Sequence, residues 1–368
     1  MMDTTNIELE KNGIKVICPI STYNINEIAT FVAQLICSKF PTLKLNYNTI
    51  FINIAKIPMY VAEMPAGMSD ACYFYKNSSI YFKKGLKFDE IKNLSFHECL
   101  HHFQEIKDSK GGLHRLGLCS YLGNKAFGSA LNEAAVQLMS AYATSEKRDI
   151  VKYYDITLPT DSPSYYPLLC NLVKQIGFLT GFSALFESTF YANDAFFDKF
   201  KQIFGERNAF KIQQNFDNLL QLEEKIIKLN NKIQEQDLSY RKFKKATDSI
   251  ANLKNKITNE FLNAQDLIIT SFFDNKMKEL NNASQIEQYR KCLYSFSNLI
   301  GRTDNYSFFN DYYIDKMSQL DIKYEQITGH SHDMSLTVVK ESKVAIFFKT
   351  LKKIFVGNSS EYDENNDW

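Results

Sequence analysis

Apolar residues recur at helical intervals across residues 24–39, and this spacing predicts a helix there. Three other N-terminal segments predict strands instead. Residues 7–18 indicate a hairpin around Asn12-Gly13, a pair that favours tight turns. Residues 49–54 are rich in β-branched side chains, and residues 71–82 read as two strands joined by a short turn. The N-terminal region is therefore expected to contain a small sheet and at least one helix.

Two longer helical patterns follow, over residues 88–107 and 129–144. A glycine-bearing loop, residues 110–128, separates them. A loop of this length allows the second helix to fold back antiparallel to the first.

Strand signals almost vanish after about residue 165. Residues 166–204 predict helices broken at Gly177 and Gly181, and residues 211–290 are polar and helical. Two runs with 3-4 spacing in the latter segment are each only about two heptads long. An antiparallel helical hairpin packed on the rest of the protein is therefore preferred to a free-standing coiled coil.

The patterns together predict an α+β fold, with a mainly helical C-terminal region. The first expected division is residues 1–205, made of an α/β region (1–86), two helices (87–145) and a further helical region (146–205). A helical hairpin or bundle over 206–335 and a tail over 336–368 are expected to follow.

Residues 342–356 in the tail form an amphipathic pattern, with apolar residues on one helical face and lysines avoiding it. We prefer a final helix docked on the core. A helix lying on a membrane surface fits the same pattern and stays an alternative.

Composition narrows the function classes. The 368 residues carry a net charge of only +1, so no global field points to nucleic acid, and no nucleic-acid partner is expected. The seven cysteines show no metal-binding or redox spacing. Without a secretion signal or a membrane-spanning stretch, the protein is expected to be cytoplasmic, with export by a signal-independent route left open.

His97-Glu98-Cys99-Leu100-His101 fits the pattern H-E-x-x-H. Positions i and i+4 project from one face of a helix, so His97 and His101 can reach one Zn²⁺. Glu98 lies about 100° around the helix, beside the metal, where its carboxylate can take a proton from a zinc-bound water. The sequence thus predicts one zinc ion per chain with Glu98 as general base.

A catalytic zinc requires a third protein ligand. The spacing from His101 to His114 does not fit the pattern with a third histidine, which leaves a carboxylate or a distant histidine. Glu133 is a candidate, because it lies 36 positions after His97 on the second predicted helix.

Over roughly residues 70–145 the chain resembles the gluzincin group of zinc peptidases. Thermolysin-like members pair H-E-x-x-H with a downstream Asn-Glu-Ala, which Asn132-Glu133-Ala134 matches. The resemblance implies a zincin-like domain and Glu133 as the third ligand. The chain departs from the family at Gln137, where those enzymes carry an Asp that orients a zinc-bound imidazole. An amide can still accept from the imidazole, but it lacks the charge that raises ligand basicity.

Amide hydrolysis also needs a donor for the developing oxyanion. Gluzincins commonly use a Tyr or His from the chain after the zinc ligands, and Tyr165 and Tyr166 are the first candidates here. His330 and His332 are the second pair. His102 is expected to pack or to bind a neighbour rather than the metal. An exposed edge near residues 68–75 is a candidate for pairing with an extended substrate.

The predicted function is a zinc-dependent peptidase acting on a peptide or protein substrate. The alternative is a zincin-like binding or regulatory protein that acts through its helical C-terminal region with little proteolysis. The intact Glu98 favours the enzyme. The oligomeric state is left open.

Overall fold

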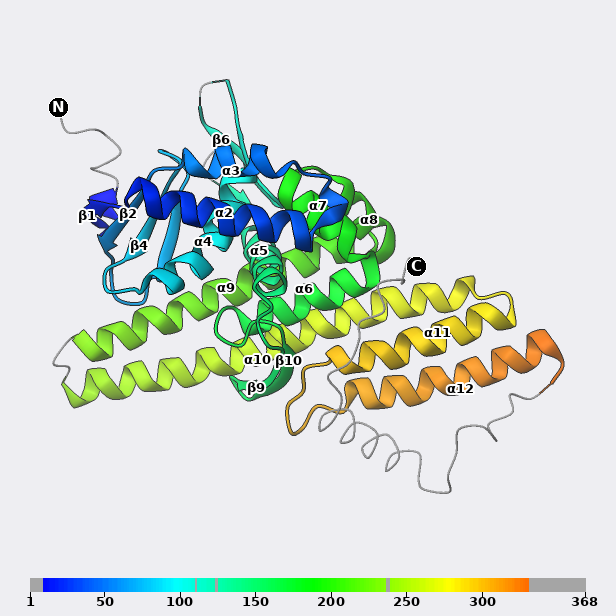
Figure 1. The fold of residues 1–368 in the computed structure, drawn as a ribbon. Helices are drawn as coiled ribbons and strands as arrows, with labels where there is room; N and C mark the ends of the chain where they lie inside the picture. The colour runs from blue at the N-terminus through cyan, green and yellow to red at the C-terminus, as the bar shows by residue number, and fades with distance from the viewer. Residues whose placement is uncertain (1–8, 110, 123–124, 236–238, 331–368) are drawn as a thin grey trace.

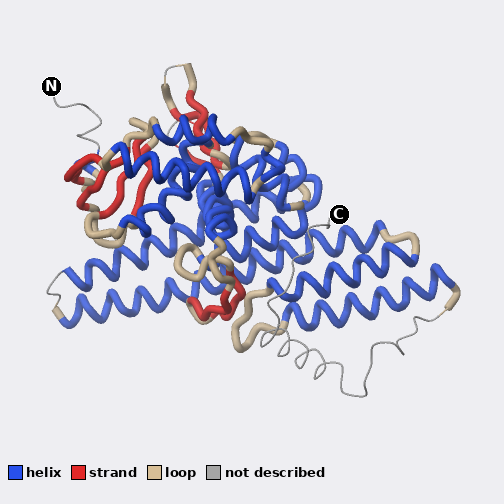
Figure 2. Tube along the Cα trace, viewed as in Figure 1, coloured by secondary structure: helices blue, strands red, loops and turns tan. Residues whose placement is uncertain are grey.

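The computed structural model describes residues 9–109, 111–122, 125–235 and 239–330, and it is a mixed α+β protein in which helices predominate. Figure 1 shows long helices filling the C-terminal region of the molecule, and Figure 2 shows the strands at three separate places. The α+β class predicted from the sequence is confirmed.

The first sheet has four strands in the order β1-β2-β4-β3. β2 and β4 are parallel, and the other two pairings are antiparallel. Because β3 ends this order, its outer edge pairs with no strand of the described residues. The two strands predicted in 71–82 are confirmed as β3 and β4. The bounds are β1 (Lys15–Pro19), β2 (Met59–Glu63), β3 (Ala71–Phe74) and β4 (Ser79–Lys83).

Helices α2 (Thr22–Lys39) and α3 (Tyr47–Ala55), with the short 3₁₀ helix η1 (Pro41–Leu43) between them, share one apolar core with this sheet and with α4 (Phe88–Phe103). The helix predicted over 24–39 is confirmed as α2.

Two predictions for the N-terminal region are wrong. Residues 49–54 lie in α3, where Asn46 caps the helix by accepting from the Thr49 N–H, and burial of Ile50 and Ile54 one turn apart outweighs their β preference. No hairpin forms at Asn12-Gly13 in the described residues. Leu9–Lys11 make a helical turn that ends at Gly13, and β1 pairs with β2 instead.

The segment between the two central helices also differs from prediction. The helix predicted over 88–107 ends at Phe103, and the expected loop 110–128 contains strands with turns at Gly111 and Gly117, both of positive φ. Its strands form a second antiparallel sheet with the order β5-β6-β7-β8. The bounds are β5 (Glu105–Lys107), β6 (Leu113–Leu116), β7 (Cys119–Leu122) and β8 (Lys125–Phe127), after which α5 (Ser129–Thr144) begins as predicted.

The C-terminal region consists of a two-stranded hairpin and a set of helices. These elements are β9 (Asp149–Tyr153), β10 (Ile156–Thr160), α6 (Pro167–Thr180), α7 (Phe182–Tyr191), α8 (Ala195–Phe204), α9 (Glu206–Glu235), α10 (Tyr240–Glu279), α11 (Ala283–Phe296), the 3₁₀ helix η2 (Ser297–Leu299) and α12 (Phe308–Thr328). The predicted helical hairpin is confirmed, because α9 and α10 run side by side in opposite directions (Figure 1).

A second, larger apolar core is shared by α5, α6, α8 and the helices from α9 to α12. The domain boundary predicted at residue 205 falls between α8 and α9, which both contribute to this core, and it stays a prediction. The break at Gly181 is confirmed. The break at Gly177 is wrong, because this glycine lies inside α6, where an added Cβ would lie 2.7 Å from the Phe182 ring.

No single helix of the described residues is long and apolar enough to cross a bilayer, and only α6 and α7 together, bent by 115°, pass that test. The amphipathic segment 342–356 and His332 lie outside the described residues.

Candidate metal centre

α4 places His97 and His101 one helical turn apart on one face. The first turn of α4 contains Asp89 and Glu90, whose negative charges suit the positive end of the helix dipole. The Glu90 carboxylate also accepts a hydrogen bond from the Lys87 N–H at 2.6 Å. The sequence therefore determines where this helix begins and the face that its histidines share.

α5 carries Glu133, and its first turn is held by a residue distant in sequence. The carboxylate of Asp217, on α9, accepts from the N–H groups of Ala130 at 3.1 Å and Gly128 at 3.4 Å. These hydrogen bonds satisfy backbone groups that a helix N-terminus leaves without partners. α9 thus helps to position the helix that supplies Glu133.

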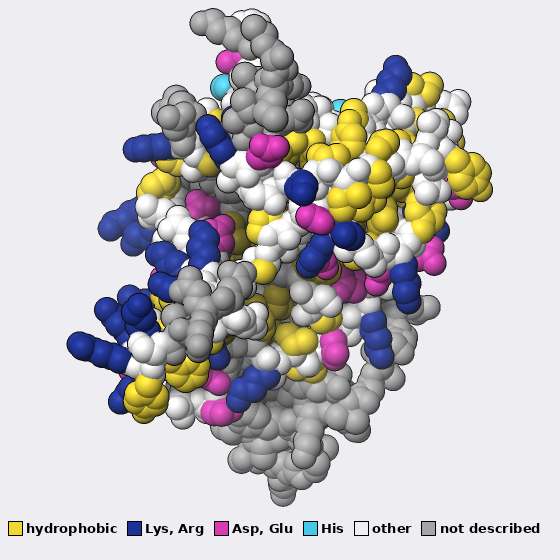
Figure 3. Space-filling view, turned by 90° about the vertical axis from the view of Figure 1, so that its left-hand side faces the viewer, with side chains coloured by type: hydrophobic (Ala, Val, Ile, Leu, Met, Phe, Trp, Pro, Cys, Tyr) yellow, Lys and Arg dark blue, Asp and Glu magenta, His cyan; other side chains and the backbone are white. Residues whose placement is uncertain are grey.

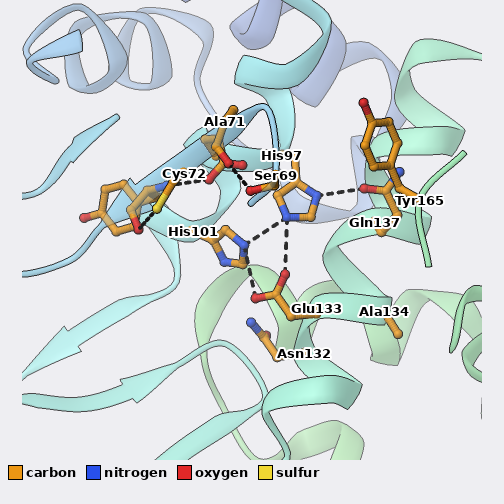
Figure 4. A network of polar contacts seen from close by, with 12 residues as sticks. Ser69, Ala71, Cys72, His97, His101, Asn132, Glu133, Ala134, Gln137 and Tyr165 are labelled. Atoms are coloured by element: carbon orange, nitrogen blue, oxygen red, sulfur yellow. Dashed lines mark hydrogen bonds and ion pairs between the residues drawn. The ribbon is translucent and has the colours of Figure 1, made fainter. Parts of the chain in front are cut away.

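The side chains of His97, His101 and Glu133 converge (Figure 4). Nε2 of His97 lies 3.0 Å from Nε2 of His101, and each of these nitrogens lies 3.5 Å from one Glu133 oxygen. Ligand atoms bound tetrahedrally to zinc at 2.0–2.1 Å lie about 3.3 Å from one another. The three spacings match that value, so this group is placed to hold a metal ion.

Each imidazole is held on its other side by a glutamine. Nδ1 of His97 forms a hydrogen bond with Oε1 of Gln137 at 2.9 Å, and Nδ1 of His101 forms one with Oε1 of Gln104 at 3.1 Å. The oxygen of a neutral amide, at positions 137 and 104, therefore orients each imidazole. Such outer contacts fix which nitrogen faces a metal.

A backbone group fixes the orientation of the Gln104 amide. The Leu118 N–H donates to Oδ1 of Asn132 at 2.9 Å, so the Asn132 amide nitrogen must be its other, donating end. That nitrogen donates to Oε1 of Gln104 at 3.2 Å. The Gln104 oxygen is therefore an acceptor, and Nδ1 of His101 carries the proton. When this imidazole is neutral, Nε2 of His101 therefore presents its lone pair to the cluster, as a metal ligand must.

Protonation of the cluster shows why a cation fits. Two Nε2 lone pairs at 3.0 Å repel each other unless a proton or a cation lies between them. Burial is the largest single effect on the pKa of His101 and lowers it, but the charge of Glu133, its hydrogen bond to His101 and the charge of Glu98 together raise this pKa to about 9. Burial raises the pKa of Glu133, but attraction to His101 and hydrogen bonds from both imidazoles lower it well below its usual range. The site thus favours one positive charge at the point where a metal would bind.

Glu98 is buried beside this group and contacts the edge of the first sheet. Its Oε2 accepts a hydrogen bond from the Tyr73 N–H of β3 at 2.6 Å. Since β3 is the edge strand, this contact ties Glu98 to the backbone on which an extended peptide could pair. The Glu98 carboxylate is therefore held in place rather than free to rotate.

A cavity of about 590 Å³ is lined by His97, Glu98, His101 and Glu133. Its walls come from β3, α4, α5, the segment before α6, and α9. The lining residues include no Lys and no Arg. They do include six carboxylates: Asp70, Glu90, Glu98, Glu133, Glu146 and Glu224. The cavity is therefore negatively charged as well as large enough for several side chains of a peptide.

Tyr165 and Tyr166 both line the cavity but differ in position. Tyr165 is exposed, lies beside Gln137, and directs its hydroxyl away from the three convergent side chains in Figure 4. Tyr166 is half-buried at the start of α6 with φ of 50°, a conformation uncommon for a residue with a side chain. Burial raises the pKa of Tyr166, and the charges of Glu133 and Glu98 raise it further.

The other candidates lie elsewhere. His330 is exposed just after α12 and does not line the cavity. His102 is outside the convergent group, and its Nδ1 lies 3.3 Å from the Tyr73 hydroxyl, as expected for a packing role. Cys99 is fully buried in the core.

Sequence reasoning missed three positioning residues. Gln104 follows His101 by three positions, a spacing that places both on one helix face, and this signal was available. The sequence indicated Asn132 only as part of the Asn-Glu-Ala signature, not as a residue that orients Gln104. The role of Asp217 has no local signal, because the backbone groups that it contacts lie 87 and 89 positions away in the sequence.

Comparison of the chain with family models, with curated proteins and with solved structures gives no match. The resemblance to gluzincins therefore rests on the residues and geometry of this chain alone.

Proposed function

We propose that this protein is a zinc-dependent peptidase with a zincin-like catalytic domain. One observation carries the proposal. His97, His101 and Glu133 converge at metal-ligand spacing, with Glu98 held beside them in a cavity next to β3, whose outer edge pairs with no strand of the described residues. Two histidines and a glutamate are a donor set typical of catalytic zinc, which keeps a fourth position open.

The residues present fit that ion in number, spacing and tautomer. When bound, zinc would lower the pKa of a water molecule toward about 7 and polarise the scissile carbonyl. Glu98 would accept the proton of the attacking water as the new carbon–oxygen bond forms. It would then deliver that proton to the amine nitrogen as the carbon–nitrogen bond breaks.

Tyr166 is the residue we assign to the oxyanion. A phenol is protonated at neutral pH, and burial raises the pKa of Tyr166 further, so its hydroxyl can donate a hydrogen bond. Tyr166 lines the same cavity as His97, Glu98, His101 and Glu133, which supports a position near the reacting carbonyl.

The substrate would bind as an extended strand along β3. Ala71–Phe74 present an edge with no neighbouring strand in the described residues, and Ala71, Cys72 and Tyr73 line the cavity. Main-chain hydrogen bonds to such an edge bind peptides largely independently of their sequence. The absence of Lys and Arg from the cavity lining favours peptides with basic residues near the cleaved bond.

The test compares the zinc-loaded wild type with Glu98→Gln on a proteome-derived peptide library. We expect the wild type to cleave, and Glu98→Gln to keep one zinc while losing roughly a hundredfold or more in rate. Glu224→Gln, an exposed carboxylate of the same cavity, is the matched control and should stay within a few-fold of wild type. Equal rates for wild type and Glu98→Gln, or no cleavage by the zinc-loaded wild type, would refute the proposal.

A further inference from the structure

The α9–α10 hairpin continues past the cavity. Leu220 and Glu224 line the cavity, and the described parts of both helices then extend below the first sheet toward the left of Figure 1. We define the distal hairpin as residues 225–234 of α9 and 239–256 at the beginning of α10. Its contacts with the first sheet's connections are few and include the hydrogen bond from Asn231 to the Ala66 carbonyl at 2.6 Å.

The distal hairpin is strongly basic. Residues 225–256 contain nine basic and three acidic residues, a net charge of +6 in a chain whose total is only +1. All nine basic side chains are exposed: Lys225, Lys228, Lys232, Arg241, Lys242, Lys244, Lys245, Lys254 and Lys256. Figure 3, which looks onto this side of the molecule, shows Lys and Arg side chains gathered at the lower left. The distal hairpin thus carries a larger net positive charge than the whole chain.

Aromatic side chains stand exposed among these charges. Tyr240 is 81% exposed and Phe243 is 45% exposed, both in the first turn of α10 beside Arg241, Lys242, Lys244 and Lys245. Burial on this stretch is confined to positions that face α9, such as Ala246. Neither packing nor internal pairing accounts for the composition of this turn. Within the described residues of the distal hairpin, the one ion pair is Lys228 with Glu224 at 3.6 Å.

We propose that the distal hairpin docks on an anionic phospholipid surface. Lysines and arginines close to such a surface are attracted to its negative charge, and their contributions add. Exposed aromatic rings between the charges suit the headgroup region, where their apolar bodies leave water. The exposed lysines and arginines are distributed over both helices of the hairpin, an arrangement that suits a broad anionic surface. This inference does not depend on the proposed peptidase activity.

The test uses the full-length protein and vesicles of two compositions, pure phosphatidylcholine or phosphatidylcholine with about 30% phosphatidylserine. We expect sedimentation with the anionic vesicles only, and release by about 0.5 M salt, because surface charges are then screened. Substituting Arg241, Lys242, Lys244 and Lys245 by Gln should weaken binding at least about tenfold. Tyr240→Ser with Phe243→Ser should weaken it as well.

A matched control replaces four exposed lysines elsewhere, Lys15, Lys56, Lys147 and Lys201, by Gln and should bind like wild type. Unchanged far-ultraviolet circular dichroism and thermal unfolding would show that each variant is folded. If the variant with all four hairpin residues replaced by Gln binds the anionic vesicles as tightly as the wild type, the inference is overturned, and segment 342–356 becomes the candidate. Equal binding to neutral vesicles, or no binding at all, would also overturn it. So would an RNA oligonucleotide that binds the hairpin and displaces anionic vesicles at the same salt concentration, because the partner would then be nucleic acid.

Discussion

Nε2 of His97 and Nε2 of His101 face each other at 3.0 Å, while both Nδ1 atoms contact glutamine side-chain oxygens. With both Nδ1 atoms acting as donors, the two facing nitrogens carry lone pairs, and only a shared positive charge makes their approach favourable. Because the supporting amides already hold this geometry, little reorganisation should accompany metal binding.

The first prediction concerns metal content. The wild type should bind one zinc per chain, and His97→Ala or Glu133→Ala should lose it, because two remaining ligands hold zinc weakly. Elemental analysis after dialysis measures this directly. Glu224→Ala, which removes a cavity carboxylate outside the cluster, should keep full stoichiometry. Full zinc content in Glu133→Ala would disprove the ligand assignment.

The second prediction is that zinc affinity rises with pH. In the metal-free protein the pKa of His101 is about 9, so at neutral pH zinc must displace a proton from this imidazole. The pKa of Glu133 is lowered, so this carboxylate is already ionised and does not compete. The apparent Kd should therefore fall about tenfold per pH unit between roughly pH 7 and 8.5, then level off near pH 9.

Competition with a chelator of known affinity at several pH values checks this dependence. Calorimetry in buffers of different ionisation enthalpy should show about one proton released per zinc at pH 7. A flat pH profile would mean that His101 carries no proton in the metal-free protein.

The third prediction concerns the effect of a negative charge at position 137, where the chain carries a neutral glutamine. Gln137→Glu keeps the shape of the side chain and its contact with Nδ1 of His97 but adds a negative charge, which raises the basicity of the imidazole. Zinc affinity should increase several-fold, and Ser162 can donate to the new carboxylate where it now accepts from Gln137. Gln221→Glu, on the exposed surface of α9, is the control for added charge. Weaker zinc binding by Gln137→Glu would contradict this account.

The fourth prediction separates backbone strain from the hydrogen bonds that hold His101. Gly117 and Gly85 both have positive φ, 54° and 96°, so alanine at either position costs about 1 kcal/mol. An added Cβ at Gly117 would lie 2.2 Å from Oδ1 of Asn132 and 2.7 Å from the Gln104 amide, whereas at Gly85 it meets nothing within 4 Å.

Gly85→Ala should therefore lower the melting temperature by a few degrees, and Gly117→Ala by more, because its Cβ also displaces buried side chains. Only Gly117→Ala should also weaken zinc binding, by roughly tenfold or more, because the Asn132–Gln104 contact orients His101. Equal zinc affinities in the two variants would show that this contact does not support the metal site.

The centre of the site was predictable because its signals are local. Two long apolar-periodic segments identified α4 and α5, and the i, i+4 histidines follow directly from helix geometry. The sequence allowed the Gln137 amide to accept from an imidazole, and Gln137 does contact Nδ1 of His97. A side chain on a well-defined helix can be placed from its position alone.

Short or tertiary features were not predictable in this way. β5 to β8 contain only three or four residues each, too few for a period of two to be distinguished from a loop. α3 was mistaken for a strand because its β-branched residues are buried by α2, a tertiary effect that overrides propensity. The orientation of Gln104 depends on the Leu118 N–H, which reaches Asn132 only once the second sheet has formed.

The last prediction distinguishes the two tyrosines and rests on the proposed peptidase function. Tyr166→Phe removes a hydroxyl that we assign to the oxyanion, so kcat should fall roughly tenfold to a thousandfold while zinc content and KM change little. Tyr165→Phe is the matched control, because its hydroxyl points away from the metal ligands and its loss should leave kcat within a few-fold of wild type. Steady-state kinetics on a peptide identified from the library, with zinc content measured on the same samples, supplies both readouts. A large loss of kcat in Tyr165→Phe with none in Tyr166→Phe would reverse the assignment, and unchanged kcat in both would place the oxyanion donor elsewhere in the cavity.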